Sequence, residues 1–233
     1  QIPEGSILPV PVIVASPTIR NVVIDDSWIY GKSRVGAFVG YGEYVLIENC
    51  TNYAFVKAYQ LSKGNDYQSC AGGIAGYIYS GTVLNCVNYG TIYSEGRLTG
   101  GIVGLTEGTS DVLNNANFGS VTGSTTGGIA AENNGEIVGC ENGGAVSGTN
   151  SVGGIVGMND GSVEDSLNTA NVTAANTHVG GVVGNLVGGE IAGSGNEGNV
   201  TGASDYIGGV AGACLGASIT ESYNSGSVTG AEK

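Results

Sequence analysis

Apolar and small positions recur along this chain in a fixed order. A unit of two glycines, an aliphatic residue and a small residue appears six times. The second glycines of these units are 28, 27, 26, 27 and 28 residues apart. A degenerate earlier copy occupies residues 36–40. The second glycines are Gly73, Gly101, Gly128, Gly154, Gly181 and Gly209.

A second block follows each of these units. An aliphatic residue is followed five positions later by Asn, and four positions later again by an aliphatic residue. Length varies only in the two gaps between blocks. The seven copies are Ile47, Asn52 and Val56; Val83, Asn88 and Ile92; Val112, Asn117 and Val121; Ile137, Asn142 and Val146; Val163, Asn168 and Val172; Ile191, Asn196 and Val200; and Ile219, Asn224 and Val228.

This periodicity predicts an all-β fold, a right-handed parallel β-helix of about seven to eight coils. Each coil has ~27 residues and three short strands, and coils stack about 4.8 Å apart, so each column repeats one type of side chain. The right-handed sense is expected because parallel coils of this length mostly have it. A leucine-rich horseshoe would need more leucine, and a propeller blade needs about 40 residues.

Two polar columns are expected inside the turns. The asparagines of the second block form a ladder in which each amide bonds to the next coil. A column of small polar residues lies two positions earlier: Cys50, Cys86, Asn115, Cys140, Ser166, Ser194 and Ser222. Cys50 and Cys86 would stack side by side in poor disulfide geometry, which favours free, buried thiols.

The chain divides into a lead-in at residues 1–29 and repeats at 30–233. All four prolines lie in the lead-in. Ile19, Ile24 and Trp28 indicate a degenerate first coil in which Trp28 helps to plug the end. The final coil offers an open edge, so we expect the natural protein to continue beyond Lys233.

Charge is distributed unevenly. Residues 98–232 contain 13 Asp and Glu and no Lys or Arg, and the whole chain has a formal charge of −13. This excludes a general nucleic-acid binder, and the absence of a long apolar run predicts no membrane insertion. The acidic residues favour a solvated surface. Divalent-cation binding at Asp160, Glu164 and Asp165 is the alternative.

Tyrosine is concentrated early, with ten of 12 between positions 30 and 93. An insertion at residues 57–69 adds further polar and aromatic side chains beside them, and such loops on a rigid scaffold often bind ligands. The alternative is that the aromatic rings only stiffen the outer wall. The candidate ligand-binding residues are Tyr53, Tyr59, Tyr67, Tyr77, Tyr79, Tyr89 and Tyr93.

Catalytic signatures are missing. The single histidine, His178, has no carboxylate or cysteine partner at a recognisable spacing, and no nucleophile elbow, zinc-binding helix or phosphate loop occurs. Asp25 and Asp26 should point to opposite sides of a strand. We therefore expect no enzyme activity, no catalytic residues, no metal and no cofactor.

The repeats resemble the GLUG repeat family, which is named for a Gly-Leu-any-Gly core followed by an Asn…Gly…Val stretch. The matching stretches include residues 153–157 with Asn168 and Val172, and residues 208–212 with residues 223–228. Ile or Val replaces Leu here. The resemblance covers residues 35–230 and implies a bacterial cell-surface or secreted protein. Family members include proteins proposed as adhesins and repeats in immunoglobulin-A-cleaving proteases, with no shared catalytic residues.

Two functions follow as expectations. The first is a non-catalytic structural and adhesive segment, a monomeric rod within a longer extracellular chain that binds a glycan or a host surface protein through its Tyr-rich half. The second is an accessory β-helix domain of a larger secreted hydrolase, which acts on protein or polysaccharide.

Overall fold

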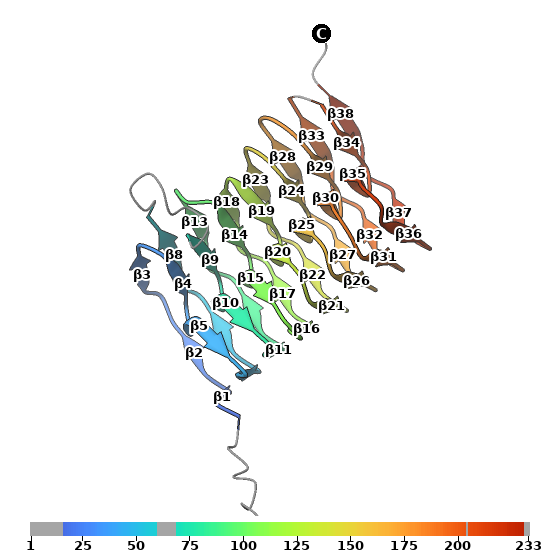
Figure 1. Ribbon diagram of the computed structural model, residues 1–233. Coiled ribbons are helices and arrows are strands. Elements are labelled where there is room, and N and C mark those ends of the chain that lie inside the picture. Colours follow the sequence, from blue (N-terminus) through green and yellow to red (C-terminus); the bar gives the residue numbers. More distant parts are fainter. Residues whose placement is uncertain (1–15, 60–68, 204, 231–233) are drawn as a thin grey trace, which may run out of the picture.

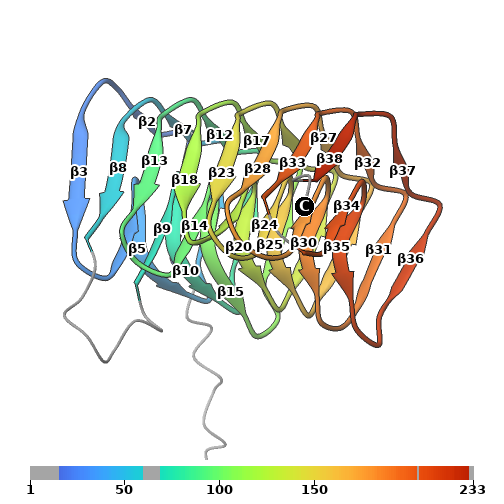
Figure 2. The same ribbon diagram turned by 90° about the horizontal axis from the view of Figure 1, so that it is seen from above.

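The computed structural model describes residues 16–59, 69–203 and 205–230. These residues form one parallel β-solenoid, and the described part contains strands and no helix (Figures 1 and 2). The chain passes through five sheets in each coil, and every strand pairs in parallel with the equivalent strand of the next coil. We name the sheets A to E in the order in which a coil visits them.

Sheet A contains β1 (Thr18–Arg20), β6 (Leu46–Glu48), β11 (Thr82–Leu84), β16 (Asp111–Leu113), β21 (Glu136–Val138), β26 (Ser162–Glu164), β31 (Glu190–Ala192) and β36 (Ser218–Thr220). Sheet B contains β2 (Val23–Ile24), β7 (Thr51–Asn52), β12 (Val87–Asn88), β17 (Ala116–Asn117), β22 (Glu141–Asn142), β27 (Leu167–Asn168), β32 (Gly195–Asn196) and β37 (Tyr223–Asn224). Sheet C contains β3 (Trp28–Gly31), β8 (Phe55–Ala58), β13 (Ile92–Ser94), β18 (Val121–Gly123), β23 (Val146–Gly148), β28 (Val172–Ala174), β33 (Val200–Gly202) and β38 (Val228–Gly230).

The other two sheets have seven strands each. Sheet D contains β4 (Arg34–Gly36), β9 (Cys70–Gly72), β14 (Leu98–Gly100), β19 (Thr125–Gly127), β24 (Val152–Gly153), β29 (Val179–Gly180) and β34 (Ile207–Gly208). Sheet E contains β5 (Val39–Glu43), β10 (Ala75–Tyr79), β15 (Val103–Glu107), β20 (Ala130–Asn133), β25 (Val156–Asn159), β30 (Val183–Leu186) and β35 (Ala211–Cys214).

The solenoid is confirmed, but each coil has five strands where the repeat pattern predicted three. The difference lies at the two glycines of the first block, which form a corner between sheets D and E. A Cβ on Gly72 would lie 2.0 Å from the carbonyl oxygen of Ala75, so the chain turns there too tightly for a side chain. The right-handed sense of the winding stays a prediction.

The asparagine ladder is confirmed in full. The Nδ2 atom of each buried Asn donates to Oδ1 of the next at 2.6–2.8 Å, over sequence separations of 36, 29, 25, 26, 28 and 28 residues. The same Nδ2 atom also donates to the carbonyl two residues ahead, at 3.2 Å for Asn52. Buried amides are thereby satisfied without water. The ladder comprises Asn52, Asn88, Asn117, Asn142, Asn168, Asn196 and Asn224.

The column of small polar residues is also confirmed. The backbone N–H of each member donates to the side chain of the next coil, as from Cys50 to Cys86 Sγ at 3.4 Å and from Cys86 to Asn115 Oδ1 at 2.8 Å. All five cysteines are free thiols, and four of them are buried. Burial raises the pKa of the Cys86 thiol to about 12 and that of Cys140 to about 11. These thiols act as small core side chains.

The first coil departs from its prediction at Trp28. Ile19 pairs with Ile47 and Ile24 with Asn52 as expected, but Ile29 pairs with Val56. Trp28 therefore points outward and is 68% exposed, so it does not plug the end of the solenoid. The insertion accounts for the 36-residue spacing between Asn52 and Asn88. Its residues 60–68 lie outside the described part, whereas Lys57 and Ala58 complete β8.

Candidate binding surface

The predicted tyrosines lie on three different faces and do not form one surface. Tyr53 and Tyr89 follow sheet B, Tyr77 and Tyr79 belong to sheet E, and Tyr59 and Tyr93 lie at sheet C. Tyr67 lies outside the described residues. Each group therefore has its own set of contacts.

The group beside sheet B is a continuous stack. The rings of Tyr53 and Tyr89 are 5.0 Å apart and inclined by 8°, and Phe118 continues the stack at 5.4 Å. Each ring covers a face of its neighbour. The stack leaves mostly ring edges for a ligand, which favours the interpretation that these rings stiffen the outer wall.

The group on sheet E is occupied by internal contacts. The Arg34 guanidinium lies 4.9 Å from the ring centroid of Tyr41 and 4.8 Å from that of Tyr77. The Tyr77 hydroxyl donates a short hydrogen bond to Glu107. Burial, and then this hydrogen bond, raise the pKa of Tyr77. These side chains bind one another, and Tyr77 is 9% exposed, whereas Tyr41 is 44% exposed.

The third group is an exposed aromatic cluster on sheet C, formed by Trp28, Tyr30, Phe55 and Tyr59. Trp28 is 68% exposed and Tyr30 is 50% exposed. Ring centroids are 5.1 Å apart for Trp28 and Phe55, and 6.1 Å apart for Tyr30 and Tyr59. Trp28 and Tyr30 also stack on each other, with ring centroids 6.0 Å apart and an interplanar angle of 26°. Only Tyr59 of this cluster was among the residues predicted to bind.

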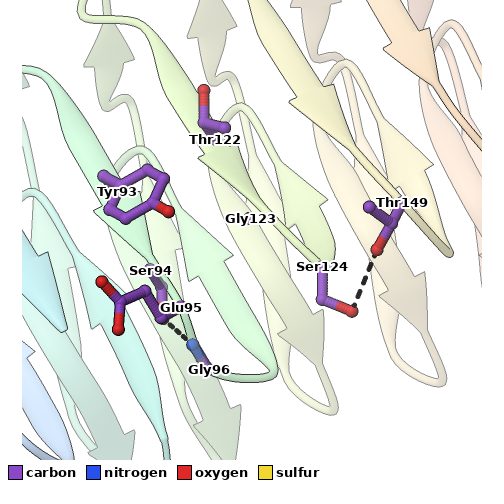
Figure 3. A pocket seen from close by; sticks show the side chains of 8 residues that line it. All are labelled: Tyr93, Ser94, Glu95, Gly96, Thr122, Gly123, Ser124 and Thr149. Atoms are coloured by element: carbon purple, nitrogen blue, oxygen red, sulfur yellow. Dashed lines mark hydrogen bonds between the residues drawn. The ribbon is translucent and has the colours of Figure 1, made fainter. Parts of the chain in front are cut away.

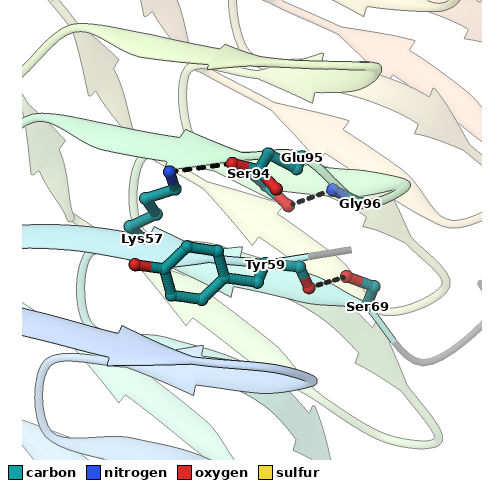
Figure 4. A network of polar contacts seen from close by, with 6 residues as sticks. All are labelled: Lys57, Tyr59, Ser69, Ser94, Glu95 and Gly96. Carbon is teal, nitrogen blue, oxygen red and sulfur yellow. Dashed lines mark hydrogen bonds and ion pairs between the residues drawn. The ribbon is translucent and has the colours of Figure 1, made fainter. Parts of the chain in front are cut away.

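A charged pair joins this cluster to the next coil (Figure 4). Lys57 Nζ lies 2.8 Å from Glu95 Oε1, 4.5 Å from the Tyr59 ring centroid and 5.2 Å from that of Tyr93. The hydrogen bond to Glu95 raises the pKa of Lys57. The pair therefore fixes Tyr59 and Tyr93 on either side of one lysine, and its two charges cancel.

An open cavity of about 400 Å³ lies where this face reaches the corner after sheet C (Figure 3). Hydroxyl groups dominate its polar lining, and Thr149 Oγ1 donates to Ser124 Oγ at 3.4 Å. Figure 3 shows Tyr93 and Glu95 on one side and Thr149 on the other. The lining residues are Tyr93, Ser94, Glu95, Gly96, Thr122, Gly123, Ser124 and Thr149.

The sequence interpretation missed Trp28, Tyr30, Phe55 and the hydroxyls of the cavity. A usable signal was present, because the residues on both sides of each inward aliphatic position must point outward. Applied to Ile29, this rule places Trp28 and Tyr30 on one face. The sequence interpretation placed Trp28 at the inward position that Ile29 occupies, so this outward face was not predicted.

The alternative of a cation site at the acidic residues is not supported. Among the residues that the structure describes, no group of three His, Cys, Asp or Glu side chains could hold a metal ion, and this includes Asp160, Glu164 and Asp165. The ring of His178 stacks on Tyr206 at 4.9 Å and 13°. No helix in the described ranges could cross a membrane.

Comparisons with known proteins assign no family to this chain. No family model matches the chain, so membership of the GLUG family stays a prediction. A search of curated proteins gave no match. Among solved structures, the chain is similar to a "putative immunoglobulin A1 protease" from Bacteroides ovatus, with 20% identity and a TM-score of 0.49. The similarity covers 94% of this chain and 61% of that one, so this chain spans about three fifths of that protein's length.

Proposed function

We propose that this chain is a non-catalytic binding segment of a secreted or cell-surface bacterial protein, and that it holds a glycan against sheet C. The observation that carries the proposal is the aromatic cluster of Trp28, Tyr30, Phe55 and Tyr59. Tyrosine and tryptophan stack on the apolar faces of sugar rings, and their polar atoms remain in water. Glycan binding suits both an adhesive segment and an accessory segment of a larger hydrolase.

The rigid scaffold supports this function. Strands β3 and β8 hold the cluster, and their main chains pair over four residues, from Trp28 with Phe55 to Gly31 with Ala58. A preordered site loses little conformational entropy when it binds. An exposed group of large apolar side chains on a chain with a formal charge of −13 also indicates an interaction surface.

A glycan array tests the proposal with three proteins. The wild type and a Tyr53→Ala/Tyr89→Ala variant should bind the same glycans, because the stack beside sheet B stiffens the outer wall and does not contact the glycan. A Trp28→Ala/Tyr30→Ala variant should lose at least tenfold in affinity while keeping its thermal midpoint. Trp28 is the single tryptophan of the chain, so its fluorescence reports binding directly.

Three results would contradict the proposal. Equal glycan binding by the wild type and the Trp28→Ala/Tyr30→Ala variant would show that the glycan does not bind at the aromatic cluster of sheet C. Binding to a host protein, with no glycan response, would assign the cluster to protein recognition. Incubation with a bound oligosaccharide should leave it uncut, and cleavage would contradict the non-catalytic role.

A further inference from the structure

The aromatic cluster and the cavity lie on the same face of the solenoid, at sheet C. Strands β3, β8, β13, β18 and β23 are consecutive neighbours in sheet C. Successive strands are about 4.8 Å apart, so β3 and β23 lie roughly 19 Å apart along the axis. The register places Trp28 beside Phe55 at the start of these strands and Thr149 just after the end of β23, so a path between them runs obliquely across the sheet. It begins at exposed rings and ends at the hydroxyls of Thr122 and Thr149.

Lys57 makes the two parts continuous. Its ammonium group contacts Tyr59 of the cluster and Tyr93 of the cavity, at 4.5 and 5.2 Å from the ring centroids. Glu95, its ion-pair partner, also lines the cavity. A ligand that covers the cluster and follows the face toward higher residue numbers therefore meets the cavity without crossing a gap in the contacts.

The charge of this path differs from that of the rest of the chain. Lys57 and Glu95 neutralise each other, and β18 and β23 contain no charged residue. The acidic residues of these coils lie elsewhere, as with Asp111 and Glu136 on sheet A. A net charge of −13 repels polyanions, whereas a neutral path does not penalise an uncharged ligand.

The chemistry changes along the path in a way that suits a chain of sugars. Ring faces at Trp28 and Tyr30 stack on pyranose rings, and the hydroxyls of Thr122, Ser124 and Thr149 exchange hydrogen bonds with sugar hydroxyls. A volume of about 400 Å³ lies within the usual range for small-ligand sites. A single sugar unit would use one part of the path only.

We infer that the ligand is an uncharged, unbranched oligosaccharide of several units, which crosses sheet C obliquely from Trp28 to the cavity at Thr149. This inference rests on the proposed glycan binding and adds its length, direction and charge. One end of the oligosaccharide stacks on the aromatic cluster. The other end places its hydroxyls among Thr122, Ser124 and Thr149.

Titrations followed by Trp28 fluorescence test the inference. The probes are cello-, manno-, chito- and malto-oligosaccharides of two to six units, with oligogalacturonates of the same lengths as anionic counterparts. For one neutral series, affinity should rise at least tenfold from the disaccharide to the hexasaccharide. The matching anionic fragments should bind at least tenfold more weakly.

Two variants test where the far end of the bound oligosaccharide lies. Thr122→Glu/Thr149→Glu should abolish the gain from length and leave disaccharide affinity within twofold of wild type. Thr201→Glu is the matched control, because Thr201 is equally exposed on sheet C but lies two strands beyond β23. It should bind the hexasaccharide as the wild type does.

Each other outcome overturns a defined part. Affinity that does not depend on length, or an unchanged Thr122→Glu/Thr149→Glu variant, overturns the oblique path and leaves glycan binding at the cluster intact. A preference for oligogalacturonates overturns the neutral ligand. A fluorescence signal that no probe changes, together with a blank glycan array, overturns both the inference and the proposed function.

Discussion

Gly101 and Asn117 meet across the interior of one coil. A Cβ on Gly101 would lie 2.5 Å from Cγ of Asn117 and 2.0 Å from the carbonyl oxygen of Gly128. The second glycine of every unit has this relationship to the ladder asparagine of its own coil. The pairs are Gly73 and Asn88, Gly101 and Asn117, Gly128 and Asn142, Gly154 and Asn168, Gly181 and Asn196, and Gly209 and Asn224.

This contact predicts a severe effect of Gly101→Ala. The added methyl group meets backbone on one side and a hydrogen-bonded amide on the other, and neither can move without breaking the ladder. We expect a loss of more than about 3 kcal/mol in the free energy of unfolding, measured by urea denaturation. Gly216→Ala is the control, because a Cβ there would have no atom within 4 Å and only the φ of +69° costs energy. Equal losses in both variants would contradict the interior contact.

Asn117→Ala should also destabilise the protein, by about 2–4 kcal/mol, because buried amide groups above and below it lose a partner. Asn88 Nδ2 donates to Asn117 at 2.7 Å, and Asn117 donates to Asn142 at 2.8 Å. Asn224→Ala removes only the exposed last member and should cost less than half as much. Urea midpoints of the two variants measure the difference, and similar midpoints would show that the ladder contributes little.

Thr126→Val should stabilise the protein by about 1 kcal/mol. Within the described residues, the fully buried hydroxyls of Thr99 and Thr126 have no hydrogen-bond partner. The next member of this column is Val152, so valine fits the site. An unpaired buried hydroxyl costs free energy that an isosteric methyl group does not.

Thr106→Val provides the contrast for this prediction. Thr106 is equally buried, but its hydroxyl donates to Asn133 Oδ1 at 2.7 Å. Its replacement should lower the free energy of unfolding by about 1 kcal/mol or more. Thermal and urea unfolding of both variants check the signs. A loss in Thr126→Val would indicate that its hydroxyl has a partner in solution.

Thiol reactivity should separate one cysteine from the other four. Cys214 is exposed, whereas Cys50, Cys70, Cys86 and Cys140 are buried. Burial raises the pKa of Cys70 to about 12, so this thiol stays protonated even at pH 9. A chromogenic disulfide reagent should therefore titrate one thiol in the native protein and five in denaturant. Rapid reaction of more than one native thiol would contradict the packed interior.

The columns of the solenoid could be predicted because the spacing from aliphatic residue to Asn to aliphatic residue never changes. Seven repeats of that spacing fix which residues share a column, and Ile47, Asn88 and Val121 all lie where the pattern places them. The five-strand cross-section could not be derived in this way. Gly72 marks a bend, but one position does not say that strands lie on both sides of it.

The binding surface was harder to predict, for a related reason. Spacing assigns a residue to a column, but the face of that column depends on the angles of the corners between sheets. Tyr53, Tyr77 and Tyr93 therefore looked equivalent in the sequence and lie on three faces. A short second ladder, in which Asn133 donates to Asn159 at 2.8 Å, was missed because two members make no visible repeat.

Every amide in the asparagine ladder is oriented in the same direction. Nδ2 of Asn52 donates toward Asn88, and the same sense continues to Asn224. Aligned hydrogen bonds polarise one another, so their small dipoles add along the row. At its start, Ile24 offers Asn52 an apolar neighbour, whereas Asn224 has no amide of a following coil as acceptor among the residues that the structure describes. The rod is thus electrically directional, although its backbone repeats evenly from coil to coil.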